Sequence, residues 1–316
     1  MKRRFRGVAA VLGLAVLNAA PACPGKVTPR TRPRIAVIVR PCVVRGMEWT
    51  LDKDHQPVTG TSAASVDQHV TDLIEQVNSI WVAGANIAFF SVPPQSNDGR
   101  IPIIEDPLTA PGESGDLEQE EGTPSLSYEV GLAVDECNQA WTKDLGANPP
   151  GIPIVLARGF VNPAGTYDTV MVGAEDPLSG VYMRAAQEGR DLCSRPRTVL
   201  AEDVAGRSVV VQTRPKDVHG QLVWNDIPVL ALVVAHELGH SLLLQHGDGR
   251  DNDGNGRFDY GCDTPEFNQF DLVAPYDQRT IMDPYTNPDW TRITPLQAQL
   301  ARAAAAVTPG TIGGPP

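Results

Sequence analysis

Two histidines and a glutamate have a spacing that suits metal-assisted hydrolysis, in the run His236-Glu237-Leu238-Gly239-His240. Residues four apart on a helix project from one face, so both histidines can offer a nitrogen to the same zinc ion. Zinc lowers the pKa of its bound water to about 7. A glutamate beside the first ligand can take a proton from this water and pass it to the leaving amine. The spacing therefore predicts a zinc hydrolase with Glu237 as general base.

A third histidine, His246, follows in the same region. On a continuous helix it would lie about 15 Å along the axis from His236, because each residue advances about 1.5 Å. Zinc–nitrogen bonds are only about 2.0–2.1 Å long. If His246 binds the same ion, the helix must end after His240 and the chain must turn back.

The four residues His236, Glu237, His240 and His246 resemble the metzincin motif HExxHxxGxxH of zinc endopeptidases. This resemblance implies three histidine ligands, a glutamate base and a turn before the third ligand. The family makes that turn at a glycine, where this chain has Leu243. A left-handed backbone is costly for other residues, so we expect either a later turn, near Gly247, or a different local geometry.

A second segment, Thr280-Ile281-Met282-Asp283-Pro284-Tyr285, resembles the Met-turn of the same family. The resemblance implies that Met282 packs beneath the metal ligands without binding the metal. Some members place a tyrosine two residues after this methionine, where it stabilises the transition-state oxyanion. Tyr285, three residues after Met282, is the candidate for that role.

Two other functions fit the same residues. In a zinc hydrolase of another HExxH clan, the third ligand would be a carboxylate, such as Asp248, Asp251 or Glu266. In a non-catalytic surface protein, metal would only stabilise the fold, but Glu237 would then have no use and four protein ligands would be usual. Three further histidines have no partner at ligand spacing and are expected to be surface or ordinary fold residues: His55, His69 and His219.

A calcium-like loop follows His246. Its candidate ligands occupy positions 1, 3, 5, 7 and 9 of such a loop, the seventh through its backbone carbonyl: Asp251, Asp253, Asn255, Arg257 and Asp259. Gly256 falls where the chain must turn sharply, whereas Cys262 replaces the usual bidentate glutamate. We expect calcium to hold this segment rigid. The alternative is a solvated acidic turn without an ion.

The N-terminal residues predict export. Basic residues at 2–6 precede an apolar stretch at 7–20, and Ala20-Pro21-Ala22 fits a signal-peptidase site. The alternative is an uncleaved anchor. Cys23 follows directly and is a candidate for lipidation. The protein is therefore expected to be secreted, periplasmic or lipid-anchored at the cell surface. Four other cysteines suggest two disulfide bonds, with three pairings open: Cys42, Cys137, Cys193 and Cys262.

The charge of the chain narrows the class of partner. Its formal net charge is −12, and loss of the basic signal segment would make it more negative. Such a surface repels nucleic acid and anionic lipid. We expect a protein or peptide substrate, no nucleic acid, and membrane contact only through a lipid anchor. The protein is expected to be a monomer.

The surrounding elements predict an α+β fold with α/β-type layers. Apolar and β-branched runs predict strands at 34–40, 86–92, 152–157, 169–172 and 208–212. Helices are expected at 65–83, at 127–145 and from Thr294-Pro295 onward. The apolar run 227–234 leads into His236 and predicts a buried active-site helix. This order resembles a metzincin catalytic domain, which implies a twisted mixed sheet with one long helix.

The domain boundaries follow from these assignments. We expect a signal peptide at 1–22, a tether at 23–33, one metallopeptidase domain at 34–307 and a flexible tail at 308–316. Within the domain, residues 93–125 are rich in Pro, Gly, Ser, Asp and Glu, and are expected to form one long exposed loop.

Overall fold

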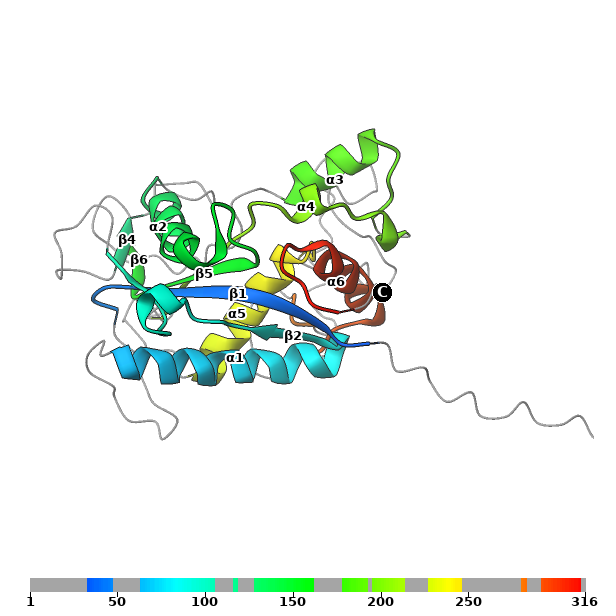
Figure 1. The fold of residues 1–316 in the computed structure, drawn as a ribbon. Helices are drawn as coiled ribbons and strands as arrows, with labels where there is room; N and C mark the ends of the chain where they lie inside the picture. Colours follow the sequence, from blue (N-terminus) through cyan, green and yellow to red (C-terminus); the bar gives the residue numbers. More distant parts are fainter. Residues whose placement is uncertain are drawn as a thin grey trace, which may run out of the picture. The chain divides into compact units, whose positions relative to one another are not determined.

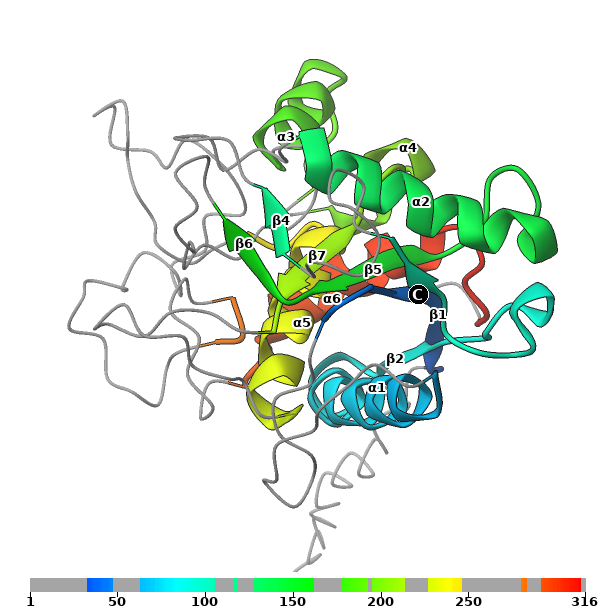
Figure 2. The same cartoon turned by 90° about the vertical axis from the view of Figure 1, so that its left-hand side faces the viewer.

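A parallel β-sheet with helices on both faces forms the centre of the protein (Figures 1 and 2). In this computed structural model the described residues are 33–47, 63–105, 116–118, 128–161, 178–192, 195–213, 227–245, 280–282 and 291–313. They belong to one unit, Pro33–Pro316. The expected signal segment, residues 1–22, and Cys23 lie outside them.

The sheet follows the order β2-β1-β5-β7, and β3 pairs with the far end of β1. The bounds of these strands are β1 Ile35–Val44, β2 Ile87–Phe90, β3 Ile103–Ile104, β5 Ile152–Ala157 and β7 Val209–Gln212. A separate pair joins β4 Asp116–Glu118 to β6 Gly159–Val161. All these pairs are parallel. The sequence predicted a mixed sheet. Among the described residues, the one antiparallel pairing is the isolated bridge between Ala36 and Ile312.

Two hydrophobic cores lie on opposite faces of the sheet. Alternate strand residues divide between them: Ile154 and Leu156 join one core, whereas Val155 and Ala157 join the other. The first core is covered by α1 Ala63–Ala85, α5 Ile227–Ser241 and α6 Pro295–Val307. The second is covered by α2 Tyr128–Leu145, and Figure 2 shows the sheet between α1 and α2. The predicted coarse architecture of strands and helices is therefore confirmed.

Local sequence explains where α6 begins and why α5 is buried. Thr294 Oγ1 accepts from the Gln297 amide at 3.2 Å, and Gln297 Oε1 accepts from the Thr294 amide at 2.9 Å. This capping box, with Pro295 at the first helical position, begins α6 where the sequence predicts. α5 is apolar on nearly every side and is therefore buried, as expected from the run that precedes His236. No helix among the described residues is both long and apolar enough to cross a membrane.

Two sequence expectations are wrong in part. Residues 93–125 contain β3 and β4 besides the short 3₁₀ turn η1 Gln95–Asn97, and Leu117 is fully buried. Ile104 and Leu117, isolated apolar residues in this polar segment, are buried, and the short strands that carry them pair with β1 and β6. Part of the tail expected at 308–316 is fixed to the sheet, because the Ala36 and Ile312 backbones exchange hydrogen bonds of 2.9 and 2.8 Å. The strand expected at 169–172 lies outside the described residues.

A buried carboxylate joins the small helices α3 Leu178–Gln187 and α4 Ala201–Val204, which also flank the 3₁₀ turn η2 Pro196–Thr198. Asp203 accepts from Arg190 at 2.6 Å and from Arg184 at 3.2 Å. Burial alone would raise the pKa of Asp203, but these hydrogen bonds and one from the Leu200 amide hold it below its usual value. The two arginines thus tie α3 to α4.

One disulfide bond links the sheet to a helix. Cys42 of β1 is bonded to Cys137 of α2 in the second core. The other two cysteines of the expected framework, Cys193 and Cys262, lie outside the described residues. The Cys42–Cys137 bond agrees with one of the three pairings that the sequence left open.

Candidate metal centre

The C-terminal half of α5 carries the two histidines and the glutamate in a buried setting. His236 is 4% exposed and Glu237 is 5% exposed. The indole of Trp81, from α1, donates to the Ala235 carbonyl at 3.1 Å and fixes the helix beside them. The long apolar face of α1 thus provides a rigid mount for the candidate ligands.

Each histidine is oriented by a backbone carbonyl. His236 Nδ1 lies 2.7 Å from the Ile281 oxygen, and His240 Nδ1 lies 2.8 Å from the Leu244 oxygen. A carbonyl oxygen can only accept, so Nδ1 carries the hydrogen in both rings. In each neutral ring Nε2 then presents a lone pair, and these two Nε2 atoms are 3.1 Å apart.

This separation fits two ligands of one zinc ion. Nitrogens bound at about 2.0–2.1 Å in a tetrahedral arrangement would lie about 3.3–3.4 Å apart. The distance of 3.1 Å is close to that value. Two lone pairs directed at each other repel unless a cation or a proton lies between them. Neutral imidazole nitrogens are common zinc ligands, and a carbonyl on the second ring nitrogen is the usual way to orient them.

Glu237 follows His236 directly in α5 and supplies a carboxylate. Its Oε2 atom is buried and has no hydrogen-bond donor among the described residues. Burial raises the pKa of Glu237 to about 8. A buried carboxylate is costly unless a cation or a donor compensates it. The donor set and this orphaned oxygen therefore both suit a cation and a water molecule.

The helix ends immediately after the second histidine. Leu243 has φ 67°, the left-handed conformation. Its amide donates to the His240 carbonyl at 3.0 Å, and the Leu244 amide donates to the Gly239 carbonyl at 2.8 Å. This pair of bonds is a Schellman motif with leucine in the position where glycine is usual. The expectation of a later turn, near Gly247, is therefore wrong: the chain leaves the helix at the position of the glycine in the metzincin motif.

The core holds Leu243 in this unfavourable conformation. A left-handed residue other than glycine costs about 1–2 kcal/mol. The side chain of Leu243 is fully buried, at 0% exposure, and such burial contributes about 1.5–3 kcal/mol. The Leu243 carbonyl also accepts from the hydroxyl of Tyr182 at 2.7 Å. Packing and hydrogen bonding thus offset the backbone strain.

Met282 lies directly against the motif helix. A Cβ atom on Gly239 would overlap the sulfur of Met282, so the glycine is needed for this close approach. The turn is anchored by the Ile281 amide, which donates to Arg292 O at 2.9 Å, and by the Ile281 carbonyl, which orients His236. Residues 280–282 therefore support α5 at two points, the candidate ligand His236 and Gly239.

Several structural contributors are not apparent from the motif. The carbonyls of Ile281 and Leu244, the indole of Trp81 and the hydroxyl of Tyr182 all act on α5 or its turn. Backbone carbonyls carry no sequence signal, because every residue has one. Gly239 did carry a signal, since a glycine inside a helix indicates close approach of another segment.

The remaining predicted site residues lie outside the described part of the chain. These are the third ligand, the oxyanion tyrosine, the calcium-loop residues and the alternative carboxylates: His246, Tyr285, Asp251, Asp253, Asn255, Arg257, Asp259, Asp248 and Glu266. Within the described ranges, no group of three or more His, Cys, Asp or Glu side chains could hold a metal. His69 is an ordinary fold residue, buried in α1, whose Nδ1 donates to the Ser65 carbonyl at 2.6 Å.

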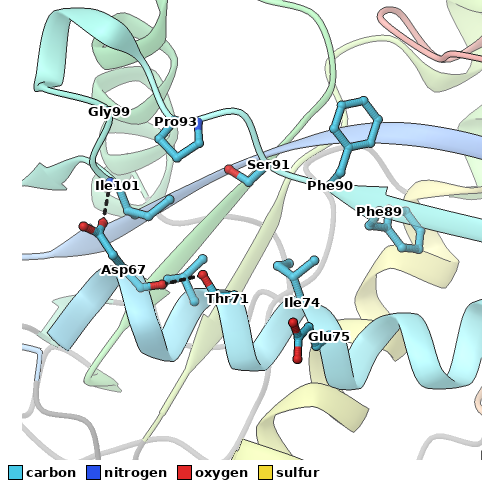
Figure 3. Close-up of a pocket in the computed structure, with 11 residues that line it drawn as sticks. Asp67, Thr71, Ile74, Glu75, Phe89, Phe90, Ser91, Pro93, Gly99 and Ile101 are labelled. Atoms are coloured by element: carbon cyan, nitrogen blue, oxygen red, sulfur yellow. Dashed lines mark hydrogen bonds between the residues drawn. The ribbon is translucent and has the colours of Figure 1, made fainter. Parts of the chain in front are cut away.

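A pocket of about 400 Å³ lies elsewhere, between α1 and the segment that follows β2 (Figure 3). Ile74, Phe89 and Ile101 contribute apolar walls, and Asp67 and Glu75 contribute carboxylates. None of its lining residues is a histidine or a cysteine. The Asp67 carboxylate already accepts from the Ile101 amide at 2.8 Å. This pocket is therefore separate from the candidate metal centre.

Comparison with known proteins adds no assignment. No family model matches the chain, and no curated protein matches its sequence. The interpretation of the centre therefore depends on the geometry of α5, of residues 280–282 and of the turn at Leu243.

Proposed function

We propose that the protein is an exported zinc-dependent endopeptidase, with His236 and His240 as metal ligands and Glu237 as general base. The observation that carries the proposal is the pair of Nε2 atoms 3.1 Å apart, in rings whose Nδ1 atoms donate to backbone carbonyls. A buried carboxylate oxygen without a donor in the described residues belongs to the intervening Glu237. Two neutral nitrogens supply two of the three protein ligands of a catalytic zinc ion, and the adjacent carboxylate can act as its general base.

The side chains have separate roles in the proposed reaction. Zinc, when bound, acts as a Lewis acid and lowers the pKa of a water molecule to about 7. Glu237 takes a proton from the attacking water and delivers it to the nitrogen of the leaving fragment. The carbonyls of Ile281 and Leu244 keep both imidazoles in the tautomer that offers Nε2.

The finer assignment is a metzincin-like catalytic domain. His246 would be the third ligand, Met282 the methionine of the Met-turn and Tyr285 the residue that stabilises the oxyanion. The turn at Leu243 supports this assignment, because it directs the chain out of α5 at the position that the motif requires. The contact between Met282 and Gly239 supports it as well.

Other parts of the proposal concern residues outside the described ranges. Calcium would bind the loop from Asp251 to Asp259, the segment 1–22 would direct export, and Cys23 would carry a lipid. Titration of calcium into the calcium-free protein should raise its melting temperature. If calcium changes neither the melting temperature nor the activity, the loop is a solvated turn.

The test of the proposed reaction combines metal analysis with one substitution. The purified protein should contain about one zinc per chain. Glu237→Gln preserves the size of the side chain, so the variant should keep its zinc but lose hydrolysis of unfolded protein substrates. Glu75→Gln is the matched control, because Glu75 is an exposed glutamate that lines the separate pocket. A Glu237→Gln enzyme as active as the wild type would exclude this mechanism.

The third ligand is tested separately. His246→Ala should reduce zinc content and remove activity, whereas His219→Ala should change neither. Should His246→Ala keep zinc and activity, a carboxylate is the third ligand, and Asp248→Asn, Asp251→Asn and Glu266→Gln would identify it. Zinc binding by the wild type without any hydrolysis would instead indicate the non-catalytic protein.

A further inference from the structure

Tyr182 of α3 holds the turn that follows the motif helix. Its hydroxyl donates to the Leu243 carbonyl at 2.7 Å, across 61 residues of sequence. Burial raises the pKa of Tyr182, so the hydroxyl keeps its proton and remains a donor. Leu243 is fully buried, so its carbonyl loses on folding the hydrogen bond that water makes in the unfolded chain, and the Tyr182 hydroxyl replaces that bond.

The held carbonyl is one peptide away from the carbonyl that orients a candidate ligand. The next oxygen along the chain, on Leu244, lies 2.8 Å from His240 Nδ1. If Leu243 left its left-handed conformation, the chain after it would change direction and the Leu244 oxygen would move away from the ring. His240 would then lose the bond that selects its tautomer and its direction.

The turn needs the hydrogen bond from Tyr182 because its central residue, Leu243, is not glycine. Leu243 has φ 67°, which glycine adopts without strain and leucine does not. The two Schellman bonds satisfy the amides of Leu243 and Leu244 but leave the Leu243 carbonyl to another donor. Tyr182 is that donor.

The helix that presents Tyr182 is itself fixed. Arg184, two residues further along α3, binds the buried Asp203 of α4 at 3.2 Å. Arg190, just after α3, binds the same carboxylate at 2.6 Å. The hydroxyl is therefore presented from an anchored helix.

We infer that Tyr182 is a positioning residue of the metal centre, which fixes the left-handed Leu243 turn and thereby orients His240. It would do for a leucine turn what the backbone freedom of glycine does in the metzincin motif. The inference rests on the proposed zinc site and adds to it a residue that contacts neither metal nor substrate.

The first test removes only the hydroxyl, with Tyr182→Phe. Zinc affinity, measured by competition with a chromophoric chelator, should fall about tenfold, the lower end of the loss expected when a ligand is deprived of its hydrogen-bond partner. The melting temperature of the metal-free protein should fall by about 2–4 °C, the effect of one hydrogen bond. Thr311→Val is the matched control, because it also removes a hydroxyl that donates to a buried carbonyl, Ala305 O, at 2.6 Å. It should lower the melting temperature similarly and leave zinc affinity unchanged.

The second test asks whether Tyr182 acts through the turn. In a Leu243→Gly background, Tyr182→Phe should reduce zinc affinity less than about twofold, because glycine adopts the left-handed conformation without strain and needs no tie to keep it. The double variant also serves if Tyr182→Phe alone does not fold. An equal loss in both backgrounds, or unchanged zinc affinity of Tyr182→Phe, would overturn the inference and leave the proposed zinc site intact. A wild-type protein that binds no zinc would overturn both.

Discussion

Replacement of Leu243 by glycine and by alanine tests the left-handed turn directly. Both variants lose a fully buried leucine side chain, which costs about 2–5 kcal/mol for a change to alanine. Alanine retains the strain of φ 67°, whereas glycine relieves it. Glycine also makes the unfolded chain more flexible, which lowers the free energy of unfolding and offsets part of the relieved strain. We expect Leu243→Gly to be more stable than Leu243→Ala by about 1 kcal/mol, with both below the wild type.

The assay is denaturation of the metal-free variants in guanidinium chloride, with the midpoints compared at constant slope. Leu238 provides the matched control, because it is equally buried but lies inside α5. There alanine should be more stable than glycine by about 1 kcal/mol, the ordinary helical preference. The order of the two variants should thus reverse between positions 238 and 243. If alanine is the more stable residue at both positions, Leu243 does not adopt the left-handed conformation.

Three further predictions concern packing, pH and the disulfide bond. Gly239→Ala should lower stability by about 1–3 kcal/mol, because the new methyl group meets the Met282 sulfur, and Met282→Ala should remove most of this penalty in the double variant, as measured by thermal unfolding. Burial raises the pKa of Glu237 from 4.5 to about 8, so the folded metal-free protein holds a proton that the unfolded chain releases. Its stability should therefore be highest below pH 4.5, as far as this group is concerned, and should fall as the pH rises to about 8; Glu237→Gln should remove that part of the pH dependence in melts at a series of pH values. Loss of the Cys42–Cys137 bond, which closes a loop with a sequence separation of 95, should cost about 4–5 kcal/mol, and a double Cys→Ala variant that unfolds at the wild-type denaturant concentration would contradict this.

Much of the secondary structure could be predicted from sequence, because its signals are local. The apolar run 152–157 is β5, and Thr294-Pro295 begins α6 through contacts within one helical turn. The uninterrupted apolar run before His236 indicated a buried helix, since a helix without a polar face has no place at the surface.

The strands that were missed are short and depend on distant partners. β3 has two residues and β4 has three, and each is a strand only because another strand pairs with it. The tail is held by Ile312, which is bonded to Ala36 at the opposite end of the sequence. The local sequence of β3, β4 and the tail does not indicate these distant partners.

The sequence by itself determined which donors the candidate centre has. His236, Glu237 and His240 share one helix, and their four-residue spacing is a property of that helix alone. Only the tertiary structure decided how they are oriented. His236 is directed by a carbonyl 45 residues away, and the turn after His240 is held by a tyrosine 61 residues from Leu243. The conformation of Leu243 could not be predicted from its own preference, because a leucine becomes left-handed only where long-range packing and hydrogen bonds outweigh the local strain.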